Sequence, residues 1–143
     1  STTMNENAVR WIGALRSGEY QQGRGVLHTV GSDGREHLYS YLGVACALYA
    51  AEHPDYPVQV RGYLGRPSQV RAYGVNGQKT SLPSVVADWL GIAMSGDEMS
   101  DIAQAKICAL AEANDTGRTF AEIANTIESE TGLFAAAANE GQS

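Results

Sequence analysis

The spacing of apolar residues along the chain predicts about five helices. In several stretches the apolar side chains recur every three or four residues, which places them on one face of a helix. The expected helices cover residues 6–17, 41–52, 82–91 and 101–113, and a further one begins after Thr119. Asn5 is a good N-cap residue, and Pro83 suits the first turn of a helix. Thr119 and Glu122 have the spacing of a capping box.

Alternation of polar and apolar residues predicts two β-hairpins. Residues 26–30 and 36–39 are expected to pair across a Gly-rich turn. The two strands of the second hairpin are an internal sequence repeat, which we call the echo: residues 59–63 are Gln-Val-Arg-Gly-Tyr, and residues 69–73 are Gln-Val-Arg-Ala-Tyr. Each copy alternates as a strand with one buried face does.

The segments between these elements carry weaker signals. An Asn-Gly pair at 76–77 predicts a tight turn, which leads into a short strand at 79–81. Residues 19–25 and 92–100 are expected to be connections, and residues 133–138 a short helix. Gly43 lies inside a predicted helix, where glycine costs about 1 kcal/mol relative to alanine, so we expect close packing against another backbone there.

These elements predict an α+β fold, with about five helices packed on a small antiparallel sheet built from hairpins. A chain of 143 residues with 43% hydrophobic residues suits one domain over residues 1–143. The ends, at 1–5 and 139–143, are expected to fray.

The echoed strands provide the best candidate for a binding site. Side chains alternate along a strand, so the odd-numbered Arg and Tyr residues of both copies are expected on one face of the hairpin. Guanidinium groups bind phosphate and stack on aromatic rings. The candidate ligand-binding residues are Arg61, Tyr63, Arg71 and Tyr73, with Arg66 at the hairpin tip and Tyr20 and Arg24 from the connection at 19–25. The alternatives are a solvated sheet face with ordinary Arg–Tyr pairs, and a Tyr20 that packs against Trp11.

Charge narrows the choice of partner. The net charge is −6, which argues against duplex nucleic acid as a partner. Residues 54–80 nevertheless hold four basic residues and one acidic residue, whereas residues 96–143 hold nine acidic and two basic residues. The basic segment therefore either binds a small anion or docks against the acidic C-terminal part. No apolar run approaches the roughly 20 residues of a membrane span, and no secretory signal is present, so we expect a cytoplasmic protein.

Signatures of catalysis and of metal binding are not found. His28, His37 and His53 lie in different segments without partners at ligand spacing. His28 and His37 could face each other across the first hairpin, where a solvent-facing pair is expected. Cys46 and Cys108 are expected to be buried free thiols. No nucleophile elbow, P-loop or dinucleotide fingerprint occurs, so we expect no cofactor and consider an enzyme the less favoured class.

Several motifs together resemble a known protein family. They are Trp11 to Gly25, with Leu15, Ser17-Gly18 and Tyr20; Leu42-Gly43-Val44 with Cys46; Leu82-Pro83 with Trp89-Leu90-Gly91; and Asn114-Asp115 with Gly117 and Phe120 to Ala124. This pattern resembles small proteins of tailed bacteriophages and prophages that have no assigned activity. The resemblance implies a nonessential accessory protein made in the host bacterial cytoplasm. Members usually carry a Cys pair where this chain has Ser40-Tyr41, which argues against a metal role for that position. The resemblance leaves the role of Asn114-Asp115 open between a helix-to-helix turn and a function.

The expected function is therefore binding without catalysis. A phage protein with a basic aromatic hairpin could sequester or block a host component, such as a nucleotide-type defence signal held by Arg61, Tyr63, Arg71 and Tyr73. One alternative is a protein–protein interaction module that docks on a host protein or self-associates. A second alternative is a small hydrolase with an unrecognised site.

Overall fold

Five α-helices and seven short strands make up the part of the chain that the computed structural model describes, residues 4–62 and 68–135. The helices are α1 (Glu6–Ser17), α2 (Tyr41–Glu52), α3 (Ser84–Trp89), α4 (Asp101–Asp115) and α5 (Phe120–Ser129), followed by a 3₁₀ turn, Thr131–Phe134. The strands are β1 (Gln21–Gln22), β2 (His28–Val30), β3 (His37–Tyr39), β4 (Val58–Gly62), β5 (Gln69–Tyr73), β6 (Met94–Ser95) and β7 (Glu98–Met99). The predicted α+β class is confirmed.

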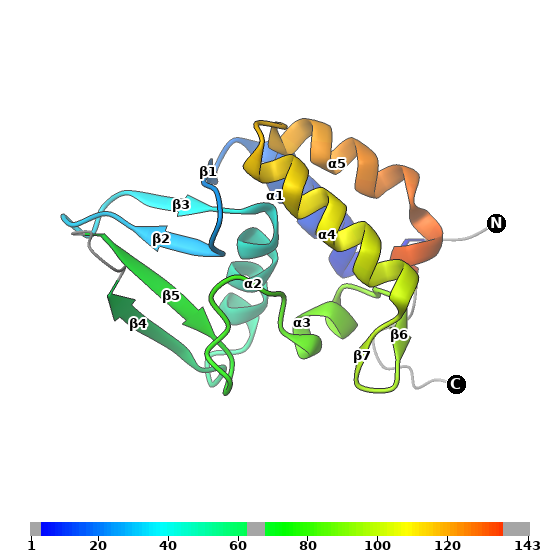
Figure 1. The fold of residues 1–143 in the computed structure, drawn as a ribbon, viewed down its shortest axis with the longest axis horizontal. Coiled ribbons are helices and arrows are strands. Elements are labelled where there is room, and N and C mark those ends of the chain that lie inside the picture. Colours follow the sequence, from blue (N-terminus) through cyan, green and yellow to red (C-terminus); the bar gives the residue numbers. More distant parts are fainter. Residues whose placement is uncertain (1–3, 63–67, 136–143) are drawn as a thin grey trace.

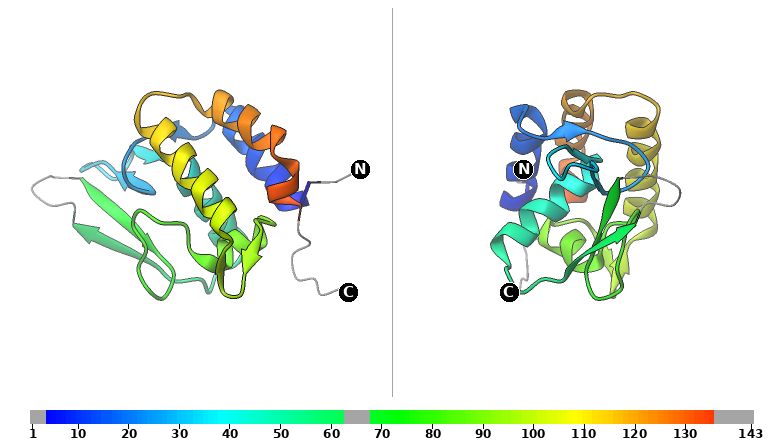
Figure 2. Two further views of the ribbon diagram at one scale, coloured as in Figure 1. Left: turned by 45° about the vertical axis from the view of Figure 1, so that its right-hand side comes forward. Right: turned by 90° about the vertical axis from the view of Figure 1, so that its left-hand side faces the viewer.

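Strands β1 to β5 form one mixed sheet in the order β1-β3-β2-β5-β4. The hairpins β2–β3 and β4–β5 are antiparallel, as is the β2–β5 pair, but β1 runs parallel to β3. The prediction of a purely antiparallel sheet is therefore wrong at this edge. Figures 1 and 2 show the sheet at one end of the molecule, α1, α4 and α5 at the other, and α2 between them.

Helix α1 anchors the helical end of the core, and its caps lie where the sequence predicts them. The Asn5 side chain accepts from the amides of the first turn, and Gly18 ends the helix at φ 80°. Trp11 is fully buried and stacks on Tyr41 with ring centroids 5.7 Å apart. Its Nε1 donates to the Tyr41 carbonyl at 2.9 Å. Apolar side chains of all five helices join Leu27 and Tyr73 in one buried cluster.

Gly43 marks a close approach between helix α2 and Leu27, the residue before β2. A Cβ at this position would lie 1.6 Å from the Leu27 carbonyl oxygen. The Leu27 backbone is held there from two sides, since its oxygen accepts from the Ser40 amide at 3.0 Å and its amide donates to the Lys79 oxygen at 2.7 Å. The predicted close backbone packing at Gly43 is confirmed.

Three local predictions require correction. Residues 92–100 are more than the expected connection, because they contain the β6–β7 hairpin. Residues 79–81 form no strand; a single bridge between Tyr73 and Gln78 closes the predicted turn. The expected helix at 133–138 is replaced, within the described residues, by the short 3₁₀ turn that ends at Phe134.

Among the described residues, the basic segment at 54–80 forms no ion pair with the acidic segment at 96–143. Figure 1 shows the β4–β5 hairpin at the opposite end of the molecule from α4 and α5. The ion pairs among the described residues join Arg10 to Glu52, Arg16 to Glu128 and Lys106 to Glu130, so neither Arg61 nor Arg71 takes part. In the described part of the chain, no helix has the length and apolar character needed to cross a bilayer.

Candidate functional site

The register of the β4–β5 hairpin separates its two arginines. Arg61 lies opposite Val70, and Arg71 lies opposite Val60. Residues directly opposite each other in an antiparallel pair project to the same face, and neighbours along a strand project to opposite faces. Arg61 and Arg71 therefore point to different sides of the sheet. The prediction that the arginines of the echo share one face is wrong.

Tyr63 and Arg66 lie outside the described residues. Arg61 is exposed and donates from Nη2 to the Gln59 side chain on its own strand. Arg24 is exposed, and its Nη2 lies 3.8 Å from the place that a Cβ on Gly117 would take, beside the turn between α4 and α5.

Arg71 and Tyr73 share their face of the sheet with His28, His37 and Tyr39, and we call these five residues the basic aromatic face. His28 lies opposite Tyr39, and their rings stack with centroids 4.1 Å apart. His28 Nδ1 lies 2.8 Å from the Tyr73 hydroxyl, and His28 Nε2 lies 2.8 Å from His37 Nδ1. Strands β5, β2 and β3 thus contribute to one hydrogen-bonded chain of side chains.

A cavity of about 350 Å³ opens at the edge of the basic aromatic face. It is lined by Glu19, Tyr20, Gln21, Arg35, Glu36, His37 and Tyr39. The Tyr20 ring packs edge-on against Tyr39, with centroids 5.1 Å apart. Trp11, the expected partner of Tyr20, packs instead against Tyr41 and Phe134. Of the predicted residues, the structure therefore brings Tyr20, Arg71 and Tyr73 to the same face.

Burial keeps the hydrogen-bonded side chains of His28 and Tyr73 uncharged. His28 is only 6% exposed, and burial, with smaller contributions from His37 and Arg71, lowers its pKa to about 4. Burial also raises the pKa of Tyr73 above its usual range. At neutral pH both groups are uncharged. A neutral imidazole has one donor and one acceptor, which matches the two contacts that His28 makes.

Arg71 provides the fixed positive charge of the face. Its side chain is half-buried, and its Nε is buried without a hydrogen-bond partner in the structure. The strands β1 to β5 contain no Asp or Glu. A buried donor of a charged group without a partner is costly, and no carboxylate on the sheet strands offsets this one. The Nε itself is inaccessible, so the terminal nitrogens of the Arg71 guanidinium are the part of the side chain that an anion from outside the chain can meet.

Sequence reasoning missed the two histidines as site residues. Both were expected to face solvent, yet His28 is buried and His37 half-buried. Their places on the two strands of the first hairpin predicted that they could face each other, and the structure confirms that contact. Among the described residues, no group of three or more His, Cys, Asp or Glu side chains is placed to hold a metal ion. Cys46 is a buried free thiol as predicted, whereas Cys108 is free and exposed, contrary to the prediction.

Asn114 joins the connection before the sheet to the end of helix α4. It is fully buried, and its Oδ1 accepts from the Tyr41 amide at 3.2 Å and from Gln22 Nε2 at 3.1 Å. Its Nδ2 donates to the Gly23 carbonyl at 2.9 Å. The neighbouring Asp115 accepts from the Gly25 amide at 2.9 Å. Both side chains therefore hold the segment that carries β1, which assigns the Asn-Asp motif a structural role.

The depressed pKa of His28 makes the folded state sensitive to acid. The unfolded chain binds a proton at His28 near pH 6.5, and the folded chain only near pH 4, so the unfolded state binds more protons between these values. As the pH drops from about 6.5 to about 4, protonation linked to His28 should therefore lower the free energy of unfolding by an amount on the order of 2 kcal/mol.

Urea unfolding of the wild type and of His28→Phe at pH 7 and pH 4.5 measures this contribution. Carboxylates that titrate in the same range contribute to both proteins, so the difference between the two pH dependences isolates His28. We expect a weaker acid dependence in the variant, and parallel curves would contradict the assignment.

Comparison with known proteins identifies a family and adds no activity. No curated protein and no solved structure is significantly similar to the chain. Residues 4–131 match the model of a domain of unknown function, DUF8296. Its description names neither a reaction nor a genomic source, so the expected bacteriophage setting stays a prediction. Because the match spans most of the chain, the protein belongs to the DUF8296 family.

Proposed function

We propose that the protein binds a small anionic ligand on the basic aromatic face and acts by holding this ligand. The observation that carries the proposal is the half-buried Arg71 guanidinium, which forms no ion pair among the described residues and lies on a sheet whose strands contain no carboxylate. An anionic oxygen is the strongest partner for a guanidinium, because the hydrogen bond is charge-assisted.

The aromatic side chains favour a ligand that also has a planar group. The Tyr39 and Tyr20 rings meet at right angles beside the cavity of about 350 Å³. Aromatic rings provide stacking surfaces for bases, and Arg can stack as well as donate. A nucleotide-type ligand would place its phosphate at Arg71, which lies outside the cavity lining, and its base near Tyr39, away from the carboxylates of Glu19 and Glu36. The Tyr73 hydroxyl is occupied by His28, so it serves to position the face.

The biological setting of the proposal rests on the sequence. The motif resemblance supports an accessory protein of a bacteriophage, for which sequestration of a host defence signal needs affinity alone. The proposed role is therefore a non-enzymatic sequestering protein in the host bacterial cytoplasm.

Isothermal titration with pyrophosphate and with linear and cyclic nucleotides tests the proposal. We expect saturable heat for at least one phosphate compound. Arg71→Met should weaken binding about tenfold or more, the loss of one hydrogen bond to a charged group. Arg61→Met is the matched control, since it removes the same charge from the opposite face of the same hairpin.

Three outcomes would overturn the proposal. One is the absence of heat across the panel, and another is an equal loss of affinity in both arginine variants. Conversion of a titrated nucleotide, seen by chromatography of the mixture, would instead establish the small hydrolase that is the enzymatic alternative.

A protein partner is the second candidate function, and strand β4 favours it. β4 ends the strand order of the described sheet, and all five of its residues are exposed, including Val58 and Val60. An exposed edge strand offers backbone groups to a strand from another chain. Self-association or capture of a stoichiometric protein by the full chain, without any phosphate ligand, would favour this alternative.

A further inference from the structure

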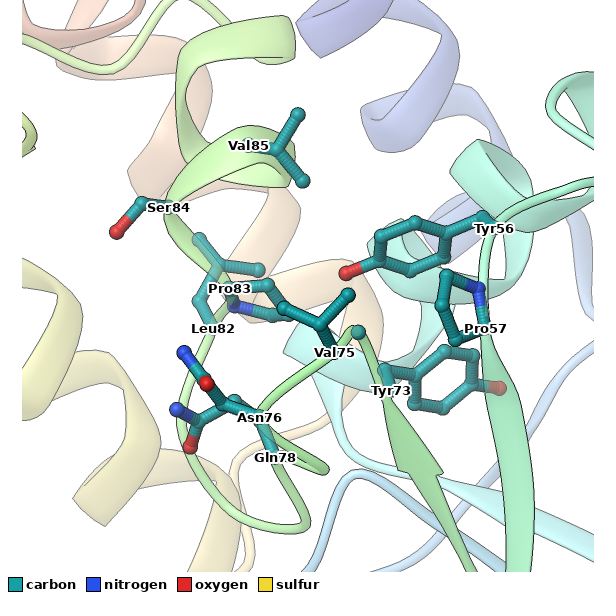
Figure 3. A pocket seen from close by; sticks show the side chains of 11 residues that line it. Tyr56, Pro57, Tyr73, Val75, Asn76, Gln78, Leu82, Pro83, Ser84 and Val85 are labelled. Carbon is teal, nitrogen blue, oxygen red and sulfur yellow. The ribbon is translucent and has the colours of Figure 1, made fainter.

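His37 connects the cavity at the basic aromatic face to the buried interior through two hydrogen bonds in series. Its Nδ1 lies 2.8 Å from His28 Nε2, and His28 Nδ1 lies 2.8 Å from the Tyr73 hydroxyl. His37 itself is half-buried and lines the cavity of about 350 Å³. Figure 3 shows the Tyr73 ring beside a separate apolar cavity, with its hydroxyl pointing away from that cavity. Among the described residues, this hydroxyl has its hydrogen bond with His28 only.

The neutral side chains favour one direction of these hydrogen bonds. Each contact needs one donor and one acceptor, so the two bonds run either from Tyr73 to His37 or from His37 to Tyr73. In the first direction the Tyr73 O–H donates to His28 Nδ1, and the His28 Nε2–H donates to His37 Nδ1. In the second direction the buried Tyr73 hydrogen has no acceptor among the described residues. Because an unpaired buried donor is costly, the neutral bonds run from Tyr73 to His37.

A proton on His37 reverses this direction. A protonated imidazole donates from both nitrogens, so His37 Nδ1 then donates to His28 Nε2, and His28 donates from Nδ1 to the Tyr73 oxygen. The net change is one proton gained from solvent, while the hydrogen of His28 moves from Nε2 to Nδ1. The charge stays on His37, because burial lowers the pKa of His28 to about 4. The reversal costs the hydrogen bond that the Tyr73 O–H donates, so it needs a further charge to favour it.

The fixed charges around His37 balance one another. Strand β2 lies between β3 and β5, so His37 and Arg71 flank His28 on the basic aromatic face. The two carboxylates beside His37 favour a proton on its ring, and the two guanidinium groups oppose it. A bound anion therefore adds the net negative charge that these surroundings lack. Among the described residues, the titratable and charged groups that face His37 are His28 on β2, Tyr39 on β3, Arg71 and Tyr73 on β5, and Glu19, Tyr20, Arg35 and Glu36 around the cavity.

From this geometry we infer that the basic aromatic face takes up one proton at His37 when it binds its anionic ligand. The inference rests on the proposed anion site and adds the way in which that site is regulated. An anion beside Arg71 stabilises the imidazolium of His37, and the imidazolium in turn attracts the anion. Because such coupling is reciprocal, the anion binds more tightly as the pH falls through the range in which histidines gain their charge.

An NMR titration of the full chain with sulfate tests the inference, because the charge of sulfate does not change between about pH 5.5 and pH 8. At constant ionic strength we expect about three- to tenfold tighter binding at the lower pH, the effect of one added charge near a protein surface. A cyclic nucleotide, whose phosphodiester also keeps its charge over this range, is the second probe. Nitrogen-15 spectra of the imidazole rings report the hydrogen bonds directly. They should show His28 protonated at Nε2 in the free protein at the higher pH, and at Nδ1 in the sulfate complex at the lower pH.

Two histidine variants separate this coupling from other effects of pH. His37→Gln keeps a polar side chain that does not titrate, and it should remove the pH dependence of binding. His53→Gln is the matched control and should retain it, since half-buried His53 lies at the end of α2 and contacts the Tyr49 carbonyl.

The possible failures are distinguishable. Equal affinity at both pH values in the wild type, or an unchanged pH dependence in His37→Gln, would overturn the inference and leave the anion site standing. So would a His28 that keeps its hydrogen on Nε2 in the complex. If neither sulfate nor the cyclic nucleotide bound at either pH, the proposed function would fail, and the inference with it.

Discussion

Gly43→Ala is expected to lower the free energy of unfolding by about 3 kcal/mol or more, or to prevent folding. The added Cβ would lie 1.6 Å from the Leu27 carbonyl oxygen, well inside any permitted contact. Either α2 or the Leu27 backbone has to move. Leu27 is tied to Ser40 and to Lys79 by backbone hydrogen bonds, so its displacement would break contacts that join the sheet to α2. Overpacking and lost hydrogen bonds thus add to each other.

Gly13→Ala is the matched control for this prediction. Gly13 also lies inside a helix, but a Cβ there would meet nothing within 4 Å. Alanine should therefore stabilise α1 by about 0.5–1 kcal/mol, through helix propensity alone. Urea unfolding followed by circular dichroism measures both variants. If Gly43→Ala were as stable as Gly13→Ala, the close approach of α2 to Leu27 would be excluded.

The helices could be predicted from the sequence because their signals are local. Asn5 and the Thr119–Glu122 capping box satisfy amides of the turn that follows them, so a few adjacent residues determine where each helix starts. Strand β1 carries no such signal. Its two glutamines show no alternation, and it pairs with β3 because Asn114 and Gln22 hold the segment in place.

Which side chains of β4 and β5 share a face could not be predicted, because this depends on the register between the two strands and not on the alternation within each strand. Alternation shows which residues of one strand share a face, but the pairing between strands decides which faces coincide. The structure pairs residue 61 with residue 70, so odd-numbered positions on β4 meet even-numbered positions on β5. A one-residue shift would have placed Arg61 beside Arg71. The burial of His28 could not be predicted either, because residues far from it in the sequence pack around it.

Asn114→Ala is expected to cost about 2–4 kcal/mol in the free energy of unfolding. The amide of Asn114 pairs with the buried Tyr41 amide, the Gly23 carbonyl and Gln22. Alanine leaves the Tyr41 donor and the Gly23 acceptor without these partners in the interior. The cost of unsatisfied buried groups exceeds the net value of the hydrogen bonds themselves. Thermal and urea unfolding at neutral pH measure the loss.

Two further variants show whether Asn114 acts through its buried hydrogen bonds. Asn125→Ala removes an exposed amide that accepts from Arg16 at 2.6 Å, and it should cost less than about 0.5 kcal/mol. Asn114→Asp keeps an acceptor for Tyr41 but places a carboxylate oxygen against the Gly23 carbonyl, so it should be destabilising as well. Equal stability of Asn114→Ala and Asn125→Ala would contradict the structural role. A stable Asn114→Asp protein would show that the donor to Gly23 contributes nothing, and the motif would then have to be explained by a function.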